Sequence, residues 1–285
     1  MSTLPRVSAI VTAYNSGRFI FRTIDSLLTQ TLTNIEVVVV DDGSTDGTPA
    51  VLDDYAARDP RVRVFHQENA GIAMAGNRAF AEARADYVAI LDHDDIALPQ
   101  RFEKQAAYLD AHPDVGLVGG GLTVIDSNER KHQTDRYPQD PTHVRRALLA
   151  GPAINHSSSM MRRKLVLQLG GYRRAFEYTV DVDLFLRILD HAEAATLPDI
   201  VVYYRSHAAQ VTSRHSPVQL LMNEVALALA KKRIAGGTDI IPPGIIVGPA
   251  TLDQLGLTDE QVSDFRRRFP TAYVRHEHGY NHAPP

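Results

Sequence analysis

The residues of this chain whose types and spacing could do chemistry begin with an acidic cluster, Asp92-His93-Asp94-Asp95. It directly follows the apolar stretch 87–91, which is short, bounded by polar residues and typical of a buried strand. Carboxylates held this close repel one another unless a cation or a network of donors neutralises them. Hard oxygen ligands suit Mg²⁺ or Mn²⁺, and such ions commonly bridge carboxylates and a diphosphate. The alternative is a solvated turn, with Asp95 as a charge near the start of the helix that follows Pro99.

A second acidic pair, Asp41-Asp42, follows the stretch 35–40, which is apolar almost throughout and typical of a strand covered by helices on both faces. The pattern predicts strands and helices in alternation: strands at 7–13, 35–40, 62–65 and 87–91, and helices at 18–29, from about Thr48, and at 72–83. This alternation predicts an α/β domain with a parallel sheet. Ligands bind such sheets beyond the carboxyl ends of the strands, and both acidic clusters lie at such ends.

The second half of the chain has a less regular pattern. We expect strands at 115–121 and 197–204, and helices at 142–150, 162–169, 180–191, 216–234 and 259–268. The expected organisation is one domain over 1–235, with a nucleotide-binding half at about 1–110 and an acceptor half at about 111–235. Residues 236–285 form a C-terminal helical appendix, flexible at 276–285. This appendix could pack against the core, form a homodimer contact or cover the acceptor site.

Composition excludes several classes of function. The net charge of −4 gives no basic field for nucleic acid, and the absence of cysteine excludes disulfides, thiolate metal sites and cysteine nucleophiles. Residues 1–6 lack the pattern of a secretory signal, and no apolar run approaches the roughly 20 residues that span a bilayer. We therefore expect a cytoplasmic protein, soluble or attached peripherally to the inner face of a membrane. The turn 13–17 lacks the G-x-G-x-x-G of a Rossmann-type oxidoreductase.

Four segments, in their order and spacing, resemble the family 2 inverting glycosyltransferases, which have a GT-A fold and use nucleotide-sugar donors. These segments are 8–15, 39–46, 92–95, and Gly170-Gly171-Tyr172 with 180–184. The resemblance implies a Rossmann-like GT-A fold, a mostly parallel central sheet flanked by helices. The absence of tryptophan separates the chain from the processive polymer synthases, which carry a Gln-x-x-Arg-Trp motif and transmembrane helices.

Two positions depart from the family pattern. Val180 stands where glutamate is common, and Gly76 stands where arginine is common. Arg78 could replace that arginine from an adjacent turn, or a donor contact is lost. These departures would fit a catalytically silent nucleotide-sugar binding module on the same fold, whereas the retention of Asp42, Asp94 and Asp181 argues against it.

The resemblance also implies roles for individual residues. Asp94 is the expected direct ligand of Mn²⁺ or Mg²⁺, and Asp92 a direct or water-mediated one. Asp42 is expected to accept a hydrogen bond from the uracil ring, and the alternative is that Asp41 and Asp42 only cap the turn. The residues expected to bind the donor are Thr12, Ala13, Tyr14, Asn15, Asp42, Asn77, Arg78, Asp92 and His93. Three further residues are expected either to contact the acceptor or a phosphate or, as an equal alternative, to have a structural role. They are His156, Arg205 and His207.

Asp181 is the expected general base, because the resemblance places it on the acceptor side. Asp183, two residues on, is expected to be a solvated or helix N-terminal charge. The terminal histidines His276, His278 and His282 are expected to be solvated.

Together these expectations describe a non-processive transferase. It would move a sugar from a nucleotide-diphosphate donor, a UDP-sugar in the first instance, to a hydroxyl of a glycan or lipid-linked acceptor. A single metal-assisted displacement would invert the anomeric centre, by the same geometric logic as in inverting glycosidases. The resemblance implies a setting in cell-surface polysaccharide or glycan assembly.

Overall fold

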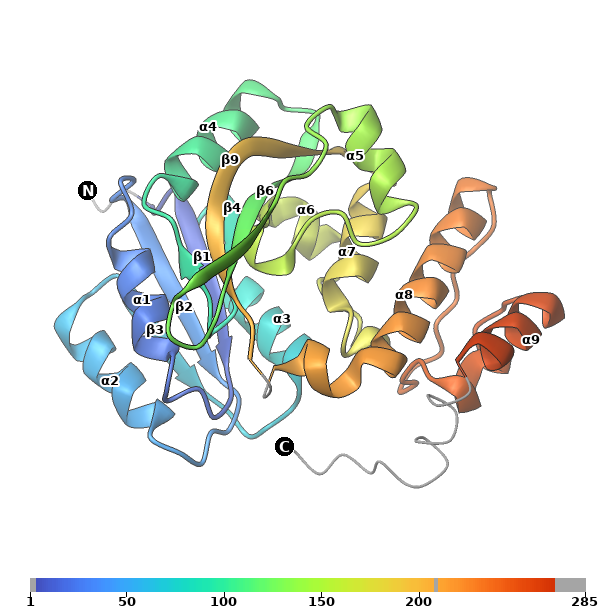
Figure 1. Ribbon diagram of the computed structural model, residues 1–285, viewed down its shortest axis with the longest axis horizontal. Coiled ribbons are helices and arrows are strands. Elements are labelled where there is room, and N and C mark those ends of the chain that lie inside the picture. Colours follow the sequence, from blue (N-terminus) through green and yellow to red (C-terminus); the bar gives the residue numbers. More distant parts are fainter. Residues whose placement is uncertain (1–3, 208–209, 270–285) are drawn as a thin grey trace.

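The computed structural model describes residues 4–207 and 210–269, and the side chains of 211–216 are not included in the description. Within these residues the chain forms one nine-stranded sheet with helices on both faces (Figure 1). The strand order is β3-β2-β1-β4-β8-β6-β9-β5, and β7 pairs with β6. The predicted α/β fold class is therefore confirmed.

The first half alternates strands and helices as predicted. Its elements are β1 (Val7–Ala13), α1 (Ile20–Leu28), β2 (Ile35–Asp41), α2 (Thr48–Arg58), β3 (Val62–His66), α3 (Ile72–Glu82) and β4 (Tyr87–Ile90). The four strands are parallel to one another. Because parallel strands end at the same edge, the loops after β1, β2 and β4 lie along that edge, which carries both acidic clusters.

The second half is where the sheet becomes mixed. Its elements are β5 (Ile96–Ala97), α4 (Arg101–Ala111), β6 (Val115–Ile125), β7 (Lys131–Asp135), α5 (Pro141–Leu148), β8 (Met160–Arg162), α6 (Arg163–Gln168), α7 (Val180–Ile188), β9 (Glu193–Arg205), α8 (Val211–Ile234) and α9 (Asp259–Arg268). Strand β8 lies antiparallel between β4 and β6, while β6 and β9 are parallel. The sequence did not predict β5, β7 or β8, because strands this short or this polar carry no recognisable alternation.

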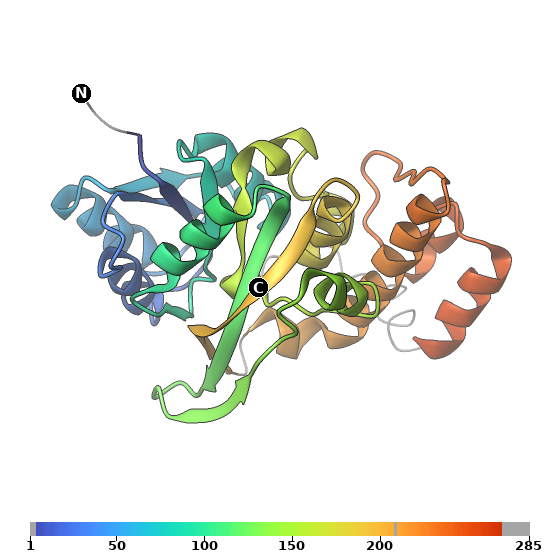
Figure 2. The ribbon, with the colours of Figure 1, turned by 90° about the horizontal axis from the view of Figure 1, so that it is seen from above.

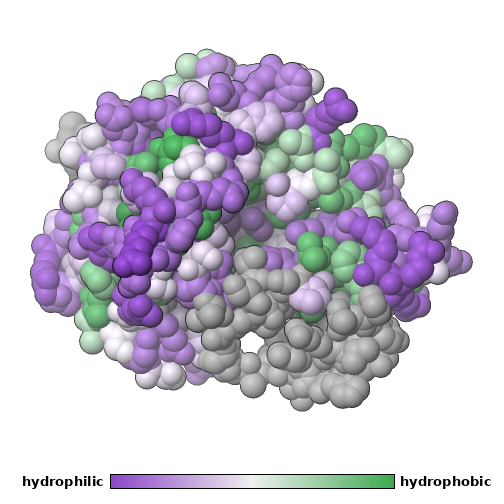
Figure 3. Space-filling model, viewed as in Figure 1, coloured by the Kyte–Doolittle hydropathy of each residue, from purple (hydrophilic) through white to green (hydrophobic). Residues whose placement is uncertain are grey.

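Two apolar layers cover the two faces of the sheet. Alternate residues of a strand point to opposite faces. Val38 therefore belongs to the apolar layer that includes residues of α3, α6, α7 and α8, whereas Val39 belongs to the layer that includes residues of α1, α2 and α4. Both residues are fully buried. This two-sided burial is the physical reason for the continuous apolar run in β2. On the outer surface seen in Figure 3, hydrophobic residues form only small, separate patches among hydrophilic ones.

Residues 236–269 return along the outer side of α8, and α9 stands beside α8 at the end of the molecule remote from β3 (Figures 1 and 2). Val247, Leu252 and Phe265 are buried in the same core cluster as α7 and α8. In the ranges that the structure describes, no helix has both the length and the apolar character needed to cross a membrane. The predicted flexible tail 276–285, with its three histidines, lies outside the described residues.

Candidate active site

The loops after β1 and β2 interlock at the carboxyl edge of the sheet. Asn15 has a left-handed backbone, with φ of 50°. Its side-chain oxygen accepts a hydrogen bond from the amide of Thr45 at 2.8 Å, and its own amide donates to Ser44 Oγ at 2.9 Å. One ring nitrogen of His93 lies 3.3 Å from the carbonyl oxygen of Thr12. The predicted donor-binding residues 12–15 therefore lie on the edge that also carries His93.

Asp42 is buried and holds the loop that precedes α3. Its carboxylate accepts hydrogen bonds from Gln67 Nε2 at 2.7 Å and from the amides of Ala70 and Gly71, both at 2.9 Å. The side chain is therefore an integral part of the loop. A uracil ring would share these carboxylate oxygens with the loop, so the predicted contact with the base stays a prediction.

Asn77 and Arg78 lie on different sides of α3. Asn77 brackets the backbone of Tyr172, donating from Nδ2 to its carbonyl at 2.8 Å and accepting from its amide at 2.7 Å. Arg78 instead donates to the carbonyl of His66 at 2.9 Å and to Gln67 Oε1 at 3.2 Å. Because Gln67 in turn holds Asp42, Arg78 supports the donor side indirectly in this structure.

Gly76 is the position where the family commonly has arginine, and here the ring of Tyr172 fills the space beside it. A Cβ at residue 76 would lie 2.5 Å from Tyr172 Cε2. The departure from the family pattern therefore has a packing reason. The aromatic ring and the glycine occupy together the volume that a longer side chain at residue 76 would need.

Two histidines from distant parts of the chain reach the acidic cluster. One ring nitrogen of His156, Nδ1, lies 2.8 Å from Asp92 Oδ1, and the other, Nε2, lies 2.8 Å from the hydroxyl of Tyr172. The Nε2 atom of His207 lies 2.8 Å from Asp94 Oδ2. Both predicted metal-ligating aspartates are thus paired with the two histidines that the sequence marked as site candidates.

The first of these pairs is charged at neutral pH. Burial alone would raise the pKa of Asp92, but the charge and hydrogen bond of His156 outweigh it and lower this pKa to about 2. Burial would lower the pKa of His156, and the charge of Asp92 raises it to about 9. The two side chains therefore form an ion pair within the site.

Asp95 is not at a helix N-terminus, as one prediction had it, because it precedes β5 and α4 begins only at Arg101. Its carboxylate accepts the amide of Arg205 at 2.7 Å. Burial, and then the charges of Asp94 and Asp92, raise the pKa of Asp95 well above its usual range. Arg101, which is fully buried, supplies a positive charge close enough to interact with the carboxylates of Asp95 and Asp92. Burial lowers the pKa of Arg101 to about 9, although Asp95 and Asp92 act to raise it.

Arg205 is 1% exposed and donates hydrogen bonds to main-chain atoms of the protein. Its Nε donates to the carbonyl of Asp94 at 2.7 Å and its Nη1 to the carbonyl of Asp126 at 3.2 Å. Its guanidinium also lies 4.6 Å from the centre of the Phe19 ring. These contacts favour the structural alternative for Arg205, since they fix the main chain of the acidic cluster.

Asp181 lies in the first turn of α7 on the acceptor side. Burial raises its pKa, the charge of His156 lowers it, and that of Asp92 raises it again. The same Asp181 charge, after burial, raises the pKa of Tyr172. Asp181 is thus near enough to His156, Asp92 and Tyr172 for its charge and theirs to influence one another. Asp183, by contrast, is 1% exposed and paired with arginines, so the expectation of a solvated charge was wrong. The alternative expectation, a charge at a helix N-terminus, is confirmed, because Asp183 lies in the first turn of α7.

Sequence reasoning missed several residues of the site: Gln67, Arg101, Tyr172 and Glu177. Tyr172 was visible only as part of the Gly170-Gly171-Tyr172 motif, and nothing in the local pattern marks the others. Glu177 caps α3, because its Oε1 accepts the amide of Ile72 at 2.5 Å. Burial raises the pKa of Glu177 to about 7, against the backbone hydrogen bonds that lower it.

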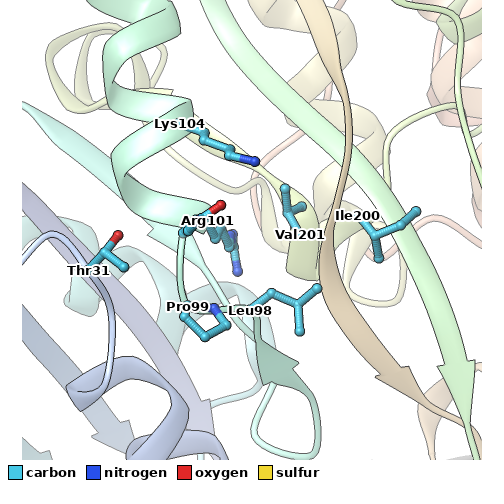
Figure 4. A pocket seen from close by; sticks show the side chains of 8 residues that line it. Thr31, Leu98, Pro99, Arg101, Lys104, Ile200 and Val201 are labelled. Carbon is cyan, nitrogen blue, oxygen red and sulfur yellow. The ribbon is translucent and has the colours of Figure 1, made fainter.

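The donor set at this edge fits a hard divalent ion. Among the residues that the structure describes, no three His, Asp or Glu side chains are arranged as a preformed metal-binding site. Two carboxylates, Asp92 and Asp94, with the imidazole of His207 beside them are nevertheless the ligand types that Mn²⁺ and Mg²⁺ accept when a diphosphate completes the coordination. The hollow of about 310 Å³ drawn in Figure 4 is lined by residues such as Leu98, Lys104 and Val201, and of the site residues named above it shares only Arg101.

Comparisons with known proteins identify the family of this chain. The family model described as glycosyl transferase family 2 matches residues 8–170. The amylovoran biosynthesis glycosyltransferase AmsE of Erwinia amylovora is 31% identical over 230 residues, which are 77% of this chain and 86% of that protein.

Two solved structures share the fold. S. aureus TarS 1–349, in complex with UDP-GlcNAc, superposes with a TM-score of 0.65 at 19% identity and covers 95% of this chain and 73% of its own. The mannosyltransferase PcManGT from Pyrobaculum calidifontis, in complex with GDP-Man and Mn²⁺, has a TM-score of 0.61 at 22% identity and covers 100% of this chain and 77% of its own. With this fold and the family match over residues 8–170, the chain belongs to glycosyl transferase family 2 and is a glycosyltransferase.

Proposed function

We propose that this chain is a non-processive, inverting glycosyltransferase that moves a sugar from a nucleotide-diphosphate donor, a UDP-sugar, to an acceptor hydroxyl. The observation that carries the proposal is that Asp181, in the first turn of α7, is near enough to the pair formed by Asp92 and His156 for their charges to act on its pKa. Burial raises the pKa of Asp181, and a carboxylate with a raised pKa is a stronger base.

The donor side of the reaction uses the loops after β1, β2 and β4. Residues 12–15 and Asp42 hold the nucleotide, and the diphosphate lies toward Asp92 and Asp94. Mn²⁺ or Mg²⁺ held by Asp94, with Asp92 as a direct or water-mediated ligand, would neutralise the charge that develops on the leaving diphosphate. His207 orients Asp94 through their hydrogen bond.

The acceptor side uses α7. Asp181 takes the proton from the acceptor hydroxyl while the hydroxyl oxygen attacks the anomeric carbon. The attack comes from the face opposite the diphosphate, so one displacement inverts the configuration. The imidazole of His156 is held between Asp92, on the donor side, and the hydroxyl of Tyr172, on the acceptor side. It thereby fixes the position of the acceptor side relative to the donor side.

The substrate class follows from similarity. The relative AmsE is named for amylovoran biosynthesis, and the two structural neighbours hold UDP-GlcNAc and GDP-Man. For this chain we propose a glycan or lipid-linked acceptor in polysaccharide assembly at the cytoplasmic face of a membrane.

Calorimetric titration with UDP, TDP and GDP, each with Mn²⁺ and with EDTA, tests the donor side. We expect tight binding of UDP that depends on Mn²⁺. Preference for GDP or TDP would be compatible with a glycosyltransferase but would overturn the proposal that Asp42 recognises uracil.

Release of nucleoside diphosphate from a panel of UDP- and GDP-sugars then tests the chemistry. Asp181→Asn should lower kcat by about a hundredfold or more, while its affinity for UDP should stay within about twofold of the wild-type value. Wild-type turnover that survives this substitution would remove Asp181 from the role of base. Binding of nucleotide without any turnover in the wild type would indicate a silent binding module instead.

A further inference from the structure

A buried group of ion pairs ties the C-terminal segment, residues 236–269, to the first turn of α7. Arg173 binds the carboxylate of Asp183 at two points, since Nε donates to Oδ2 at 3.0 Å and Nη2 donates to Oδ1. Its Nη1 donates to Asp239 Oδ2 at 2.9 Å. The side chains of Asp183 and Asp239 are only 2% and 5% exposed. Arg173 therefore bridges a carboxylate of α7 and a carboxylate of the C-terminal segment.

Two further arginines complete this group. Arg187 donates from Nε to Asp183 Oδ2 at 3.0 Å. Arg233, near the end of α8, donates from Nη1 to Asp239 Oδ2 at 2.7 Å and from Nε to Asp190 Oδ2 at 2.6 Å. The guanidinium groups and carboxylates of the group balance in charge. Removal of the Asp239 charge would therefore leave two largely buried arginines facing each other without their shared partner.

The group lies directly behind the candidate active site. Arg173 follows Tyr172, whose hydroxyl contacts His156 in the site. Asp183 comes two residues after Asp181, and residues two apart on an α-helix project about 200° from one another. Asp183 thus faces the arginines while Asp181 faces the site. The two-point contact between Asp183 and Arg173 sets the rotation of the turn that carries Asp181.

The C-terminal segment makes a second contact with the same region. The amide of Val247 donates to the carbonyl of Ala175 at 2.7 Å. Ala175 belongs to the 3₁₀ turn Arg174–Phe176, which connects Arg173 to α7. The docking of the C-terminal segment and the orientation of the first turn of α7 are therefore linked at two points.

From these contacts we infer that Asp239 is a positioning residue for Asp181, acting through Arg173 and Asp183. The inference rests on the proposed function, because it assigns Asp239 to the geometry of the proposed base. Residues 236–269 lie beyond the stretch 8–170 that matches the family model. Through Asp239 the C-terminal segment thereby takes part in positioning the proposed base, in addition to covering apolar residues of α8.

The test compares Asp239→Asn with Asp253→Asn in the full chain. Asp253 pairs with Arg266 inside the C-terminal segment, and both side chains are exposed, so it controls for the loss of an ion pair. We expect Asp239→Asn to lower kcat about ten- to a hundredfold, because a small misplacement of a catalytic group has an effect of this size. The KM for the sugar nucleotide and the affinity for UDP should stay within about twofold. Asp253→Asn should change none of these.

Hydrogen exchange of the amides of residues 181–184 supplies a readout that does not need turnover. We expect these amides to exchange faster in Asp239→Asn than in Asp253→Asn, while amides elsewhere in the chain exchange at equal rates in the two variants. If the wild type turns over no sugar nucleotide, the proposed function fails, and this comparison still decides whether Asp239 holds the turn.

Three results would overturn the inference. These are an unchanged kcat in folded Asp239→Asn, a parallel loss of kcat and UDP affinity, and equal exchange rates in the two variants. Should Asp239→Asn fail to fold, Arg173→Lys takes its place, since it keeps the charge and loses the two-point contact. A wild-type kcat in Arg173→Lys would equally overturn the inference.

Discussion

The imidazole of His156 and the carboxylate of Asp92 form an ion pair, with Nδ1 and Oδ1 2.8 Å apart, across the edge where β4 ends. Asp92 comes from the loop after β4, and His156 begins the 3₁₀ turn that precedes β8. Because β8 lies beside β4 in the sheet, the two loops meet. Through His156 this pair connects Asp92, on the proposed donor side, to Tyr172, on the proposed acceptor side.

Substitution of His156 by asparagine should therefore lower kcat about tenfold or more, since Asp92 loses its charged partner and Tyr172 loses its hydrogen bond. Steady-state release of nucleoside diphosphate at saturating donor measures this. The control is His143→Asn, because His143 and its partner Asp140 are both exposed. Equal kcat values for the two variants would contradict the role of the pair.

Gly76→Ala should perturb the site from the side of α3. The new Cβ would lie 2.5 Å from the ring of Tyr172, so the ring must shift, which disturbs the hydrogen bond between its hydroxyl and His156. We expect a loss of about 1–3 kcal/mol in the free energy of unfolding and a lower kcat. The control is Gly151→Ala, because no atom lies within 4 Å of a Cβ at Gly151. Denaturant titration of both variants measures the difference, and an unperturbed Gly76→Ala would show that the packing is looser than described.

Neighbouring aspartates should differ in their effect on metal-dependent binding. Asp94→Asn should remove most of the Mn²⁺-dependent part of the affinity for UDP, at least about tenfold, because Asp94 is the proposed ligand. Asp95→Asn keeps an oxygen that can accept the amide of Arg205, so it should bind UDP nearly as the wild type does. Calorimetry with Mn²⁺ and with EDTA measures both. If UDP binding by Asp94→Asn still depended on Mn²⁺, Asp94 would not be the metal ligand.

Glu177 should make stability depend on pH. Its folded pKa is raised to about 7 by burial, above the usual value of 4.5, so the protonated form is favoured in the folded state. This contribution is fully present below the unfolded pKa and is lost as the pH rises through about 7. Glu177→Gln should remove the dependence and gain about 3 kcal/mol at most over the wild type at alkaline pH. Denaturant titrations at acidic and alkaline pH measure the difference, and identical pH profiles for the two proteins would refute it.

Local sequence patterns were enough to predict the first half of the fold. The apolar runs of β1, β2 and β4, separated by helical periodicity, predicted parallel strands, and the carboxyl edge follows from that arrangement. The positions of Asp42 and Asp92 at this edge therefore follow from the local pattern alone. Strand β8 could not be predicted in this way, because three residues carry no period and its last residue was expected to begin the following helix.

What only the tertiary structure decided is which distant side chains meet at that edge. His156 and Asp92 are 64 residues apart, and His207 and Asp94 are 113 apart. The contact of Asp239 with Arg173 spans 66 residues. Local composition sets the type and length of an element, whereas the order of strands in the sheet decides which loops become neighbours. The sequence by itself therefore determined the candidate reacting carboxylates and their edge, and the packing of β8, β9 and the C-terminal segment decided the partners that orient them.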